Sequence, residues 1–271
     1  MHCDLHTHTT ASDGALAPQA LLERAREHGV THLAITDHDT MAAYDDLRAP
    51  AGLTLVPGIE LSTRWRRTGV HVVGLAVDRA EDGMAAGIAS QQAARRRRAR
   101  RIAERLVRAG LPDLLAAAER NGGDNVGRPH FAQALVDGGH VRDTRAAFRR
   151  YLGSGKPGDV RSEWATLDEA VGWITGAGGI AVLAHPAHYR LTRTRLRELV
   201  ADFRAAGGRA LEVVSGRQDS AVTERLAALA ADAGLLASLG SDFHRPDGPW
   251  ADVGGCPPLP AACRPVWSAW D

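Results

Sequence analysis

The chain has 271 residues, enough for one large α/β domain or two small domains. A hydrophobic content of 44% and a charged content of 24% are those of an ordinary globular protein, and a net charge of +1 argues against polyanion binding by the surface as a whole. The three cysteines have no paired spacing, so we expect no disulfide framework and a reducing, cytoplasmic compartment. No secretory signal and no apolar run near ~20 residues is present, so we expect no membrane association.

The first part of the chain alternates short apolar strands with helices. Pro18 suits the first turn of a helix and Gly29 its end, with a polar loop between this helix and the strand that precedes it. The sequence predicts a short strand within the first thirteen residues, strands at 33–35, 53–60 and 70–77, and helices at 18–28 and 40–48.

The middle of the chain has no convincing strand. It predicts helices at 91–109, 112–120, 129–137 and 144–152. The arginine run at 95–101 is expected to be a solvated helix face, because successive residues point all round a helix and no aromatic residues are interleaved for base stacking.

The strand–helix alternation then resumes, with helices predicted at 167–177, 194–206 and 220–233 and strands at 180–186, 210–215 and 236–244. The tail from Arg245 is expected to pack irregularly. We therefore divide the chain into a first part of a barrel at 1–77, a helical insertion at 78–160 and a second part of the barrel at 161–271.

Candidate metal ligands fall at the carboxyl end of nearly every predicted strand. His6 and His8 share one face of the first strand because side chains alternate. About seven strands separated by helices predict a parallel sheet, and strand ends can surround one point only if that sheet closes. We expect an α/β fold, a (β/α) barrel of about seven strands with the helical insertion after the fourth. His71 sits early in its strand and reaches the site only if that strand enters from the site's side.

The candidate ligands exceed what one ion needs, and they suit two or three divalent ions with Glu60 bridging a pair. They are His6, His8, Asp13, His38, Glu60, His71, His185, Asp242 and His244. A histidine and carboxylate shell without cysteine suits Zn²⁺, Mn²⁺ or Fe²⁺. Clustered ions of this kind hydrolyse phosphate esters, because one ion makes hydroxide from a bound water while its neighbour stabilises the leaving oxygen. They could also polarise an amide or lactone carbonyl.

The motifs, in order over nearly the whole chain, resemble those of the PHP (polymerase and histidinol phosphatase) phosphoesterases. They are Asp4-x-His6-x-His8 with Asp13, Thr36-Asp37-His38-Asp39, Gly58-Ile59-Glu60, His71-Val72-Val73-Gly74, Ala184-His185-Pro186 and Gly240-Ser241-Asp242-Phe243-His244. The resemblance implies a distorted (β/α)₇ TIM-like barrel. It also implies one ion on His6, His8, Glu60 and Asp242, a second on Glu60, His71 and His185, and a third on Asp13, His38 and His244. Asp13 stands where many members of this family have His.

The insertion resembles that of PHP members acting on 3′,5′-nucleotide bisphosphates or short 5′-phosphorylated RNA, in Gly127-Arg128-Pro129-His130-Phe131-Ala132 and Tyr151-Leu152-Gly153-Ser154-Gly155-Lys156-Pro157. By that resemblance Arg128, His130 and Lys156 would bind substrate phosphate. Asp159 departs from the aromatic residue common there. We further expect Asp4, Asp37 and Asp39 to orient imidazoles, and Glu212 to take part or to be structural.

These observations favour a metal-dependent phosphoesterase for nucleotides or short 5′-phosphorylated oligonucleotides, acting by metal-bound hydroxide attack. Glu60, Asp242 and His185 are the catalytic candidates, and we expect either His185 or a water to protonate the leaving oxygen. Alternatives are a small-metabolite phosphomonoesterase such as a histidinol phosphatase, a metallo-amidohydrolase, for which no predicted strand ends in Lys, and a non-catalytic regulatory or nucleic-acid-binding domain. We see no sign of an obligate protein partner.

Overall fold

The computed structural model describes residues 1–160, 163–246 and 251–270. The strands are β1 (Cys3–Thr7), β2 (His32–Ile35), β3 (Thr54–Trp65), β4 (Thr68–Leu75), β5 (Ala165–Thr166), β6 (Ile180–Leu183), β7 (Ala210–Ser215) and β8 (Leu236–Gly240). The α-helices are α1 (Pro18–Glu27), α2 (Asp82–Arg108), α3 (Leu115–Gly122), α4 (Arg128–Asp137), α5 (Thr144–Ala147), α6 (Leu167–Gly176), α7 (Arg193–Ala205) and α8 (Ser220–Asp232). A π-helical turn (Phe148–Leu152) and short 3₁₀ turns at Ala42–Tyr44, Pro186–Tyr189 and Val266–Ala269 complete the elements.

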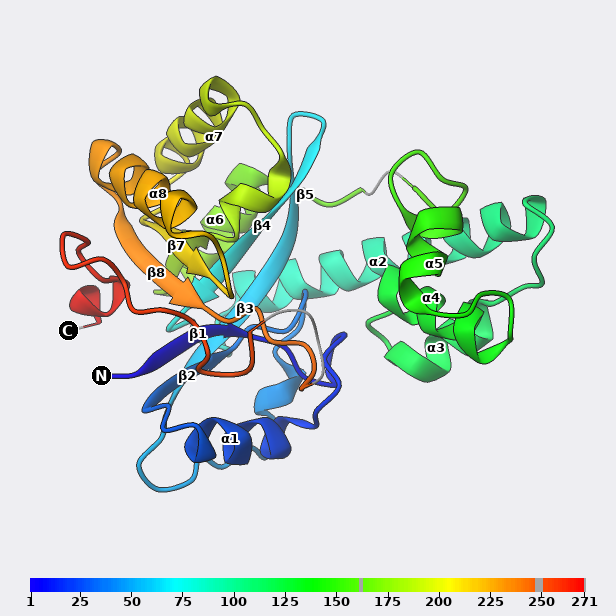
Figure 1. Cartoon of the computed structure of the whole chain (residues 1–271), viewed down its shortest axis with the longest axis horizontal. Coiled ribbons are helices and arrows are strands. Elements are labelled where there is room, and N and C mark those ends of the chain that lie inside the picture. The colour runs from blue at the N-terminus through cyan, green and yellow to red at the C-terminus, as the bar shows by residue number, and fades with distance from the viewer. Residues whose placement is uncertain (161–162, 247–250, 271) are drawn as a thin grey trace.

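The strands form a nearly closed barrel in the order β1-β2-β3-β4-β6-β7-β8, with the two-residue β5 paired to β3 (Figure 1). The ends meet through a bridge between Thr7 and Phe243 and a 2.9 Å hydrogen bond from the Asp242 N–H to the His6 carbonyl. Gly240 allows this approach, because a Cβ there would lie 2.3 Å from the His6 Cβ. The predicted α/β barrel with an insertion after the fourth strand is confirmed.

The predicted parallel sheet is wrong at β4. This strand is antiparallel to both β3 and β6, because β3 runs on to Trp65 and turns directly into β4 as a hairpin. The hairpin pairs His71 with Ser62. The reversed direction brings the beginning of β4 to the site, which meets the condition that we set for His71.

The predicted helix at 40–48 is also wrong. Only a 3₁₀ turn forms there, at Ala42–Tyr44. It inserts the Tyr44 hydroxyl between the end of β2 and the middle of β3, where the hydroxyl donates to the Ile35 carbonyl at 2.7 Å and accepts from the Gly58 N–H at 2.7 Å. The segment at 40–48 therefore does not form an α-helix along its whole length. Its short turn instead places a side chain that bridges both strands.

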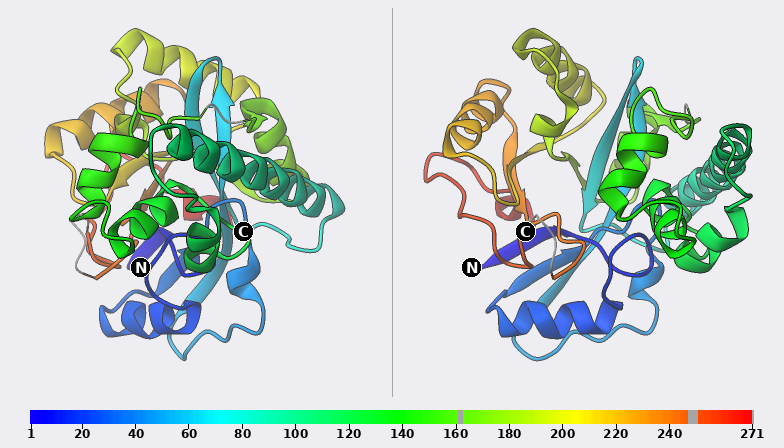
Figure 2. Two further views of the ribbon diagram at one scale, coloured as in Figure 1. Left: turned by 90° about the vertical axis from the view of Figure 1, so that its right-hand side faces the viewer. Right: turned by 45° about the vertical axis from the view of Figure 1, so that its right-hand side comes forward.

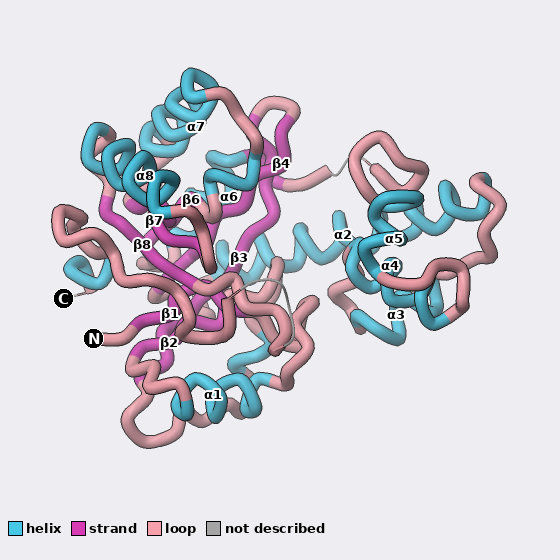
Figure 3. The backbone as a smooth tube through the Cα atoms, in the orientation of Figure 1, coloured by secondary structure: helices cyan, strands magenta, loops and turns pink. Residues whose placement is uncertain are grey.

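Helices cover the outside of the barrel and form a second cluster to one side (Figure 3). The barrel core includes Leu5, Ile35 and Phe243. A separate hydrophobic core joins the second half of α2 with α3, α4, α5 and the π turn, through residues such as Ile102 and Phe131. Helix α2 therefore belongs to both units, and it begins nine residues before the predicted start. When the molecule is viewed from the side of this second cluster, the inserted helices lie in front of the sheet (Figure 2, left).

The arginine run lies on α2 and is only partly a solvated face. Arg96, Arg97, Arg100 and Arg101 are exposed, as predicted. Arg95 is 6% exposed and forms a buried ion pair with Asp39, so the prediction is wrong for this residue. Across the described ranges, no helix combines the length and apolar character that crossing a membrane requires.

Candidate metal centre

The centre starts at the end of β1, where His6 and His8, the residue directly after the strand, turn to the same side. Both imidazoles are almost fully buried. The His6 Nε2 atom lies 3.3 Å from Glu60 Oε2 and 3.5 Å from Asp242 Oδ1. The His8 Nε2 atom lies 3.3 Å from each of the same two oxygens. Two nitrogens and two carboxylate oxygens thus converge from β1, β3 and the end of β8.

A second group of imidazoles contacts Oε1, the other oxygen of the Glu60 carboxylate. His71 Nδ1 lies 2.8 Å from Glu60 Oε1, and His185 Nε2 lies 2.9 Å from it. His185 follows β6 with a left-handed φ of 27°, in a backbone region that residues other than glycine rarely adopt. Glu60 therefore has different imidazoles on its two oxygens.

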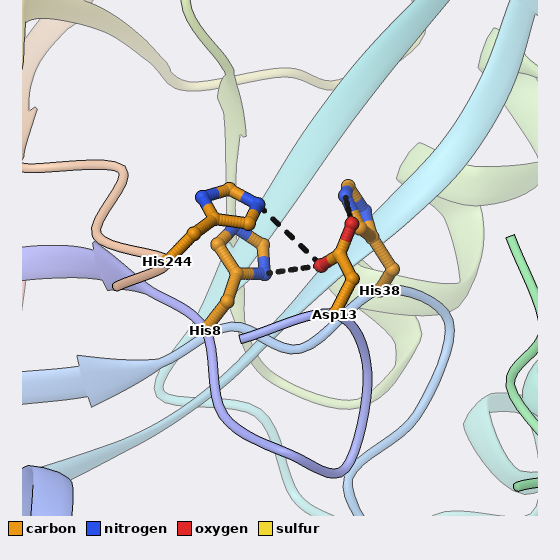
Figure 4. Close-up of side chains that lie close together, drawn as sticks. All are labelled: His8, Asp13, His38 and His244. Carbon is orange, nitrogen blue, oxygen red and sulfur yellow. Dashed lines mark ion pairs between the residues drawn. The ribbon is translucent and has the colours of Figure 1, made fainter. Parts of the chain in front are cut away.

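A third group surrounds Asp13, in the loop after β1 (Figure 4). His244 Nε2 lies 3.4 Å from Asp13 Oδ1, and His8 Nδ1 lies 4.0 Å from the same oxygen. His38 Nε2 lies 3.9 Å from Asp13 Oδ2, while its Nδ1 atom lies 3.0 Å from Glu60 Oε2. All nine predicted ligand side chains therefore meet at one end of the barrel, and the imidazoles of His8 and His38 each face two groups.

The imidazoles and carboxylates shift each other's pKa strongly. Burial raises the pKa of the Glu60 carboxyl, but the imidazoles of His38, His71 and His6 outweigh burial and hold it well below its usual range. Burial opposes ionisation of His244 as well, yet the Asp13 carboxylate raises the pKa of this imidazole to about 10. The centre therefore keeps its carboxylates ionised at neutral pH.

The buried polar atoms of the centre fit divalent cations. Within the described part of the chain, His6 Nε2, His8 Nε2 and Glu60 Oε2 have no hydrogen-bond partner, although water cannot reach them. Leaving such atoms buried and unpaired costs free energy unless a cation is bound there. Sets of ligand atoms lie within 4.8 Å of one another around Asp13 and around each side of Glu60. Histidine and carboxylate ligands without cysteine suit Zn²⁺, Mn²⁺ or Fe²⁺.

Carboxylates that are not candidate ligands accept hydrogen bonds from the loops that carry the ligands. Asp4 accepts from the Gly254 N–H at 2.7 Å and from the N–H of Ser241, the residue before Asp242, at 2.8 Å. Asp37 accepts from the N–H and the hydroxyl of Thr9, at 2.7 and 2.6 Å. The hydrogen bonds found for Asp4, Asp37 and Asp39 in the described ranges go to backbone, hydroxyl, amide and guanidinium groups. The imidazole contacts that we expected of them are not among these bonds.

Glu212 at β7 contacts an imidazole directly. Its Oε1 atom lies 3.1 Å from His6 Nδ1, and its Oε2 atom accepts from the His185 N–H at 2.5 Å. It is 2% exposed. This residue thereby fixes a member of each group around Glu60. The sequence signal for that role was a carboxylate within an otherwise apolar strand.

Comparison with known proteins agrees with this geometry. A model of the PHP domain matches residues 4–160. A 3′,5′-nucleoside bisphosphate phosphatase from Chromobacterium violaceum is 44% identical over 269 residues, covering 97% of this chain and 94% of the relative. The chain belongs to the PHP family. The 5′-3′ exoribonuclease Rnm of Escherichia coli is 44% identical over 274 residues, covering 99% of this PHP protein and 93% of the relative.

Solved PHP-like structures share the fold. A Chromobacterium violaceum protein described as an amidohydrolase, with bound sulfate, has a TM-score of 0.91 at 43% identity and covers 99% of this chain and 95% of that one. A putative metal-dependent phosphoesterase from Bifidobacterium adolescentis has a TM-score of 0.81 at 29% identity, covering 98% and 93%. The PHP fold of this chain is therefore shared along its full length.

In this PHP protein the three predicted phosphate-binding residues of the insertion differ from one another in burial and in their contacts. His130 is buried, and burial lowers its pKa although the nearby Asp13 carboxylate opposes this. Arg128 is half-buried and donates to the Leu152 carbonyl at 3.4 Å. Lys156 is exposed in the loop after the π turn. His130 therefore lies beside the candidate metal centre, and no contact in the described ranges connects Lys156 to it.

Proposed function

We propose that this chain is a metal-dependent phosphoesterase that hydrolyses phosphate esters of nucleotides or of short 5′-phosphorylated oligonucleotides. The observation that carries the proposal is the carboxylate of Glu60, whose two oxygens face separate imidazole groups. A carboxylate so placed suits the bridge between two ions in phosphate-ester hydrolysis. The substrate class is supported by relatives at 44% identity that are named for nucleoside bisphosphates and for RNA.

In this proposal the residues hold two or three divalent ions, Mn²⁺, Fe²⁺ or Zn²⁺. The assigned ligands are His6, His8, Glu60 and Asp242 for the first ion, Glu60, His71 and His185 for the second, and Asp13, His38 and His244 for the third. When bound, such ions lower the pKa of a coordinated water and neutralise charge on the phosphoryl group.

We assign the side chains of Glu60, Asp242 and His185 to catalysis. Burial raises the pKa of the Asp242 carboxyl, but the imidazoles of His6 and His8 hold it well below its usual range, so this ligand is anionic at neutral pH. His185 has its Nε2 atom on Glu60. We assign to this imidazole, or to a water, the delivery of a proton to the leaving oxygen.

Positive charge on α2 and at the start of α4 supports an anionic substrate. Burial and the neighbouring guanidiniums of Arg128 and Arg95 lower the pKa of Arg98 to about 9. A bound phosphate would relieve this repulsion, because planar guanidiniums can bind phosphate through paired hydrogen bonds. We therefore assign Arg128, with His130 and Lys156, to a phosphate group other than the one hydrolysed.

A turnover screen tests the proposed function. Purified protein with Mn²⁺ is assayed on a 3′,5′-bisphosphonucleotide, on 5′-phosphorylated di- to pentanucleotides and on histidinol phosphate, with chelator-treated protein as the control. We expect turnover of the nucleotide substrates that chelation abolishes. Turnover of histidinol phosphate alone would overturn the assigned substrate class.

Replacing Arg128 tests the phosphate-binding assignment. Arg128→Ala should raise KM for 3′,5′-bisphosphonucleotides about tenfold or more, since a charge-assisted contact contributes about 1.5–3 kcal/mol. It should leave p-nitrophenyl phosphate, which has no second phosphate, within about twofold. Arg108→Ala, at the exposed end of α2, is the matched control. Equal effects of Arg128→Ala on both substrates would contradict the assignment.

A further inference from the structure

One side chain of the insertion joins two barrel loops that carry candidate ligands. Asn125 lies between α3 and α4 and is 5% exposed. Its Nδ2 atom donates to the His38 carbonyl at 2.5 Å and to the Ala11 carbonyl at 3.3 Å. Ala11 belongs to the loop that carries Asp13. The insertion therefore contacts the barrel at the two loops whose spacing defines the third ligand group.

The orientation of this amide is fixed by its partners. Both partners are carbonyl oxygens, which only accept hydrogen bonds, so the NH₂ group of Asn125 must face them. In that orientation its Oδ1 atom is buried and has no hydrogen-bond partner in the described ranges. Leaving a buried acceptor unpaired costs folding free energy. A side chain that holds two loops at this cost is poorly explained as a device for stability alone.

Neighbouring contacts reinforce the same junction. On α2, Arg95 forms a buried ion pair with Asp39, which directly follows His38. Gln91, one turn earlier, places its Nε2 atom 3.0 Å from Asp39 Oδ1. The insertion thus holds the segment after β2 from two elements, α2 and the α3–α4 loop, and Asn125 is the member that also reaches the Asp13 loop.

We propose that Asn125 is a positioning residue that sets the separation between Asp13 and His38 and thereby the affinity for the third ion. This inference rests on the metal centre of the proposed function. The His38 Nε2 to Asp13 Oδ2 distance of 3.9 Å is too long for a hydrogen bond. It lies within the span of about 4.2 Å that two ligands of one ion can reach when each is at about 2.1 Å. Asp37 also joins the two loops through Thr9 and Ser12, so removal of the Asn125 contacts loosens the spacing of Asp13 and His38 without separating the loops.

The test is a Mn²⁺ titration of metal-free protein, read as ions bound per chain at each free Mn²⁺ concentration. The variants are Asn125→Ala and Asn125→Asp, which keeps the shape of the side chain but removes both N–H donors. We expect the third ion, assigned to Asp13, His38 and His244, to lose about 10- to 100-fold in affinity in both variants, as for other partners that orient ligands. The ions held by Glu60 should keep their wild-type affinity.

Gln133→Ala provides the matched control. Gln133 lies on α4, and its amide donates to Asp137 on the same helix at 2.7 Å. This variant should bind all ions as the wild type does. Unchanged affinity for the third ion in Asn125→Ala, or an equal loss at every site, would overturn the inference.

Hydrogen exchange of the metal-free protein gives a second readout that does not depend on activity. The N–H groups of Ser12 and Gly14 bond to the Thr9 carbonyl within the Asp13 loop. They should exchange faster in Asn125→Ala, with the β-strands unchanged. A wild type that never binds a third ion overturns this inference alone, whereas a wild type that binds fewer than two ions and has no turnover overturns the proposed function.

Discussion

At the scale of single residues, the candidate centre depends on carboxylates with two separate contacts each. Glu212 bonds the His6 imidazole through one oxygen and the His185 backbone through the other. A glutamine could present only one acceptor, so one of these two N–H donors would face an NH₂ group. Glu212 is thus suited to keep both histidines turned towards Glu60.

Glu212→Gln should therefore weaken metal binding about 10- to 100-fold, as is typical for a group that orients a metal ligand. Activity lost at low Mn²⁺ should return at high Mn²⁺, because the ligands themselves remain. Glu224→Gln, on the exposed side of α8, is the control. A Mn²⁺ titration curve equal to that of the wild type would show that Glu212 has no such role.

Which residues the sequence could reveal depends on how local the signal is. The alternation of a strand predicts that His6 and His8 share a face, and strand ends predict that distant ligands meet. The contacts of Asn125 and Arg95 follow from the way the insertion packs on the barrel. Nothing in the local pattern of α2 distinguishes the buried Arg95 from its exposed neighbours.

At the scale of elements, a side chain connects two strands where their backbone pairing ends. The hydroxyl of Tyr44 bridges β2 and β3 at their last paired residues, by bonding the Ile35 carbonyl and the Gly58 N–H. The sequence predicted a helix at 40–48, and it gives no sign that one hydroxyl bonds the backbone of both strands. The β3–β4 hairpin escaped prediction for a related reason, since its strands are as apolar as parallel ones.

Tyr44→Phe should lower the free energy of unfolding by about 1–3 kcal/mol, because the ring stays while the buried Gly58 N–H loses its acceptor. Urea unfolding of metal-free protein measures the change. Tyr151→Phe is the control, since no hydrogen bond of the Tyr151 hydroxyl is found in the described ranges. A loss no larger than that of the control would contradict the bridging role.

The ion pair between Asp39 and Arg95 joins α2 to the segment after β2. Asp39→Asn should lower the free energy of unfolding at pH 7 by about 3–5 kcal/mol, because it leaves a buried guanidinium unpaired. Although burial raises the pKa of the Asp39 carboxyl, Arg95 lowers it below the ordinary value. The contribution of this carboxylate is therefore complete above about pH 4, the unfolded pKa, and is lost as pH falls through the folded pKa.

Urea unfolding of wild type and Asp39→Asn at pH 7, 5 and 3.5 checks this sign. The difference between the two proteins should be similar at pH 7 and 5 and smaller at pH 3.5. A difference that grows on acidification would contradict the assignment of the ion pair.

At the scale of the whole molecule, two hydrophobic cores share one helix. We propose that residues 78–160 form a structural unit of their own, between barrel parts at 1–77 and 161–271, because most of their buried side chains pack on each other. The first turns of α2 are an exception, since Met84 packs in the barrel core. The barrel was predictable because ligands recur at successive strand ends. The docking of the insertion was not, because it depends on a few polar contacts far apart in sequence.

The central claim is that the ring of histidines and carboxylates holds a multi-ion centre bridged by Glu60. Metal analysis of Mn²⁺-loaded protein, after removal of free ions, tests it most directly. The wild type should retain at least two ions per chain, and Glu60→Gln should retain at least one fewer, because it removes the ligand shared by two groups. Fewer than one ion per wild-type chain, or equal retention by both proteins, would contradict the account.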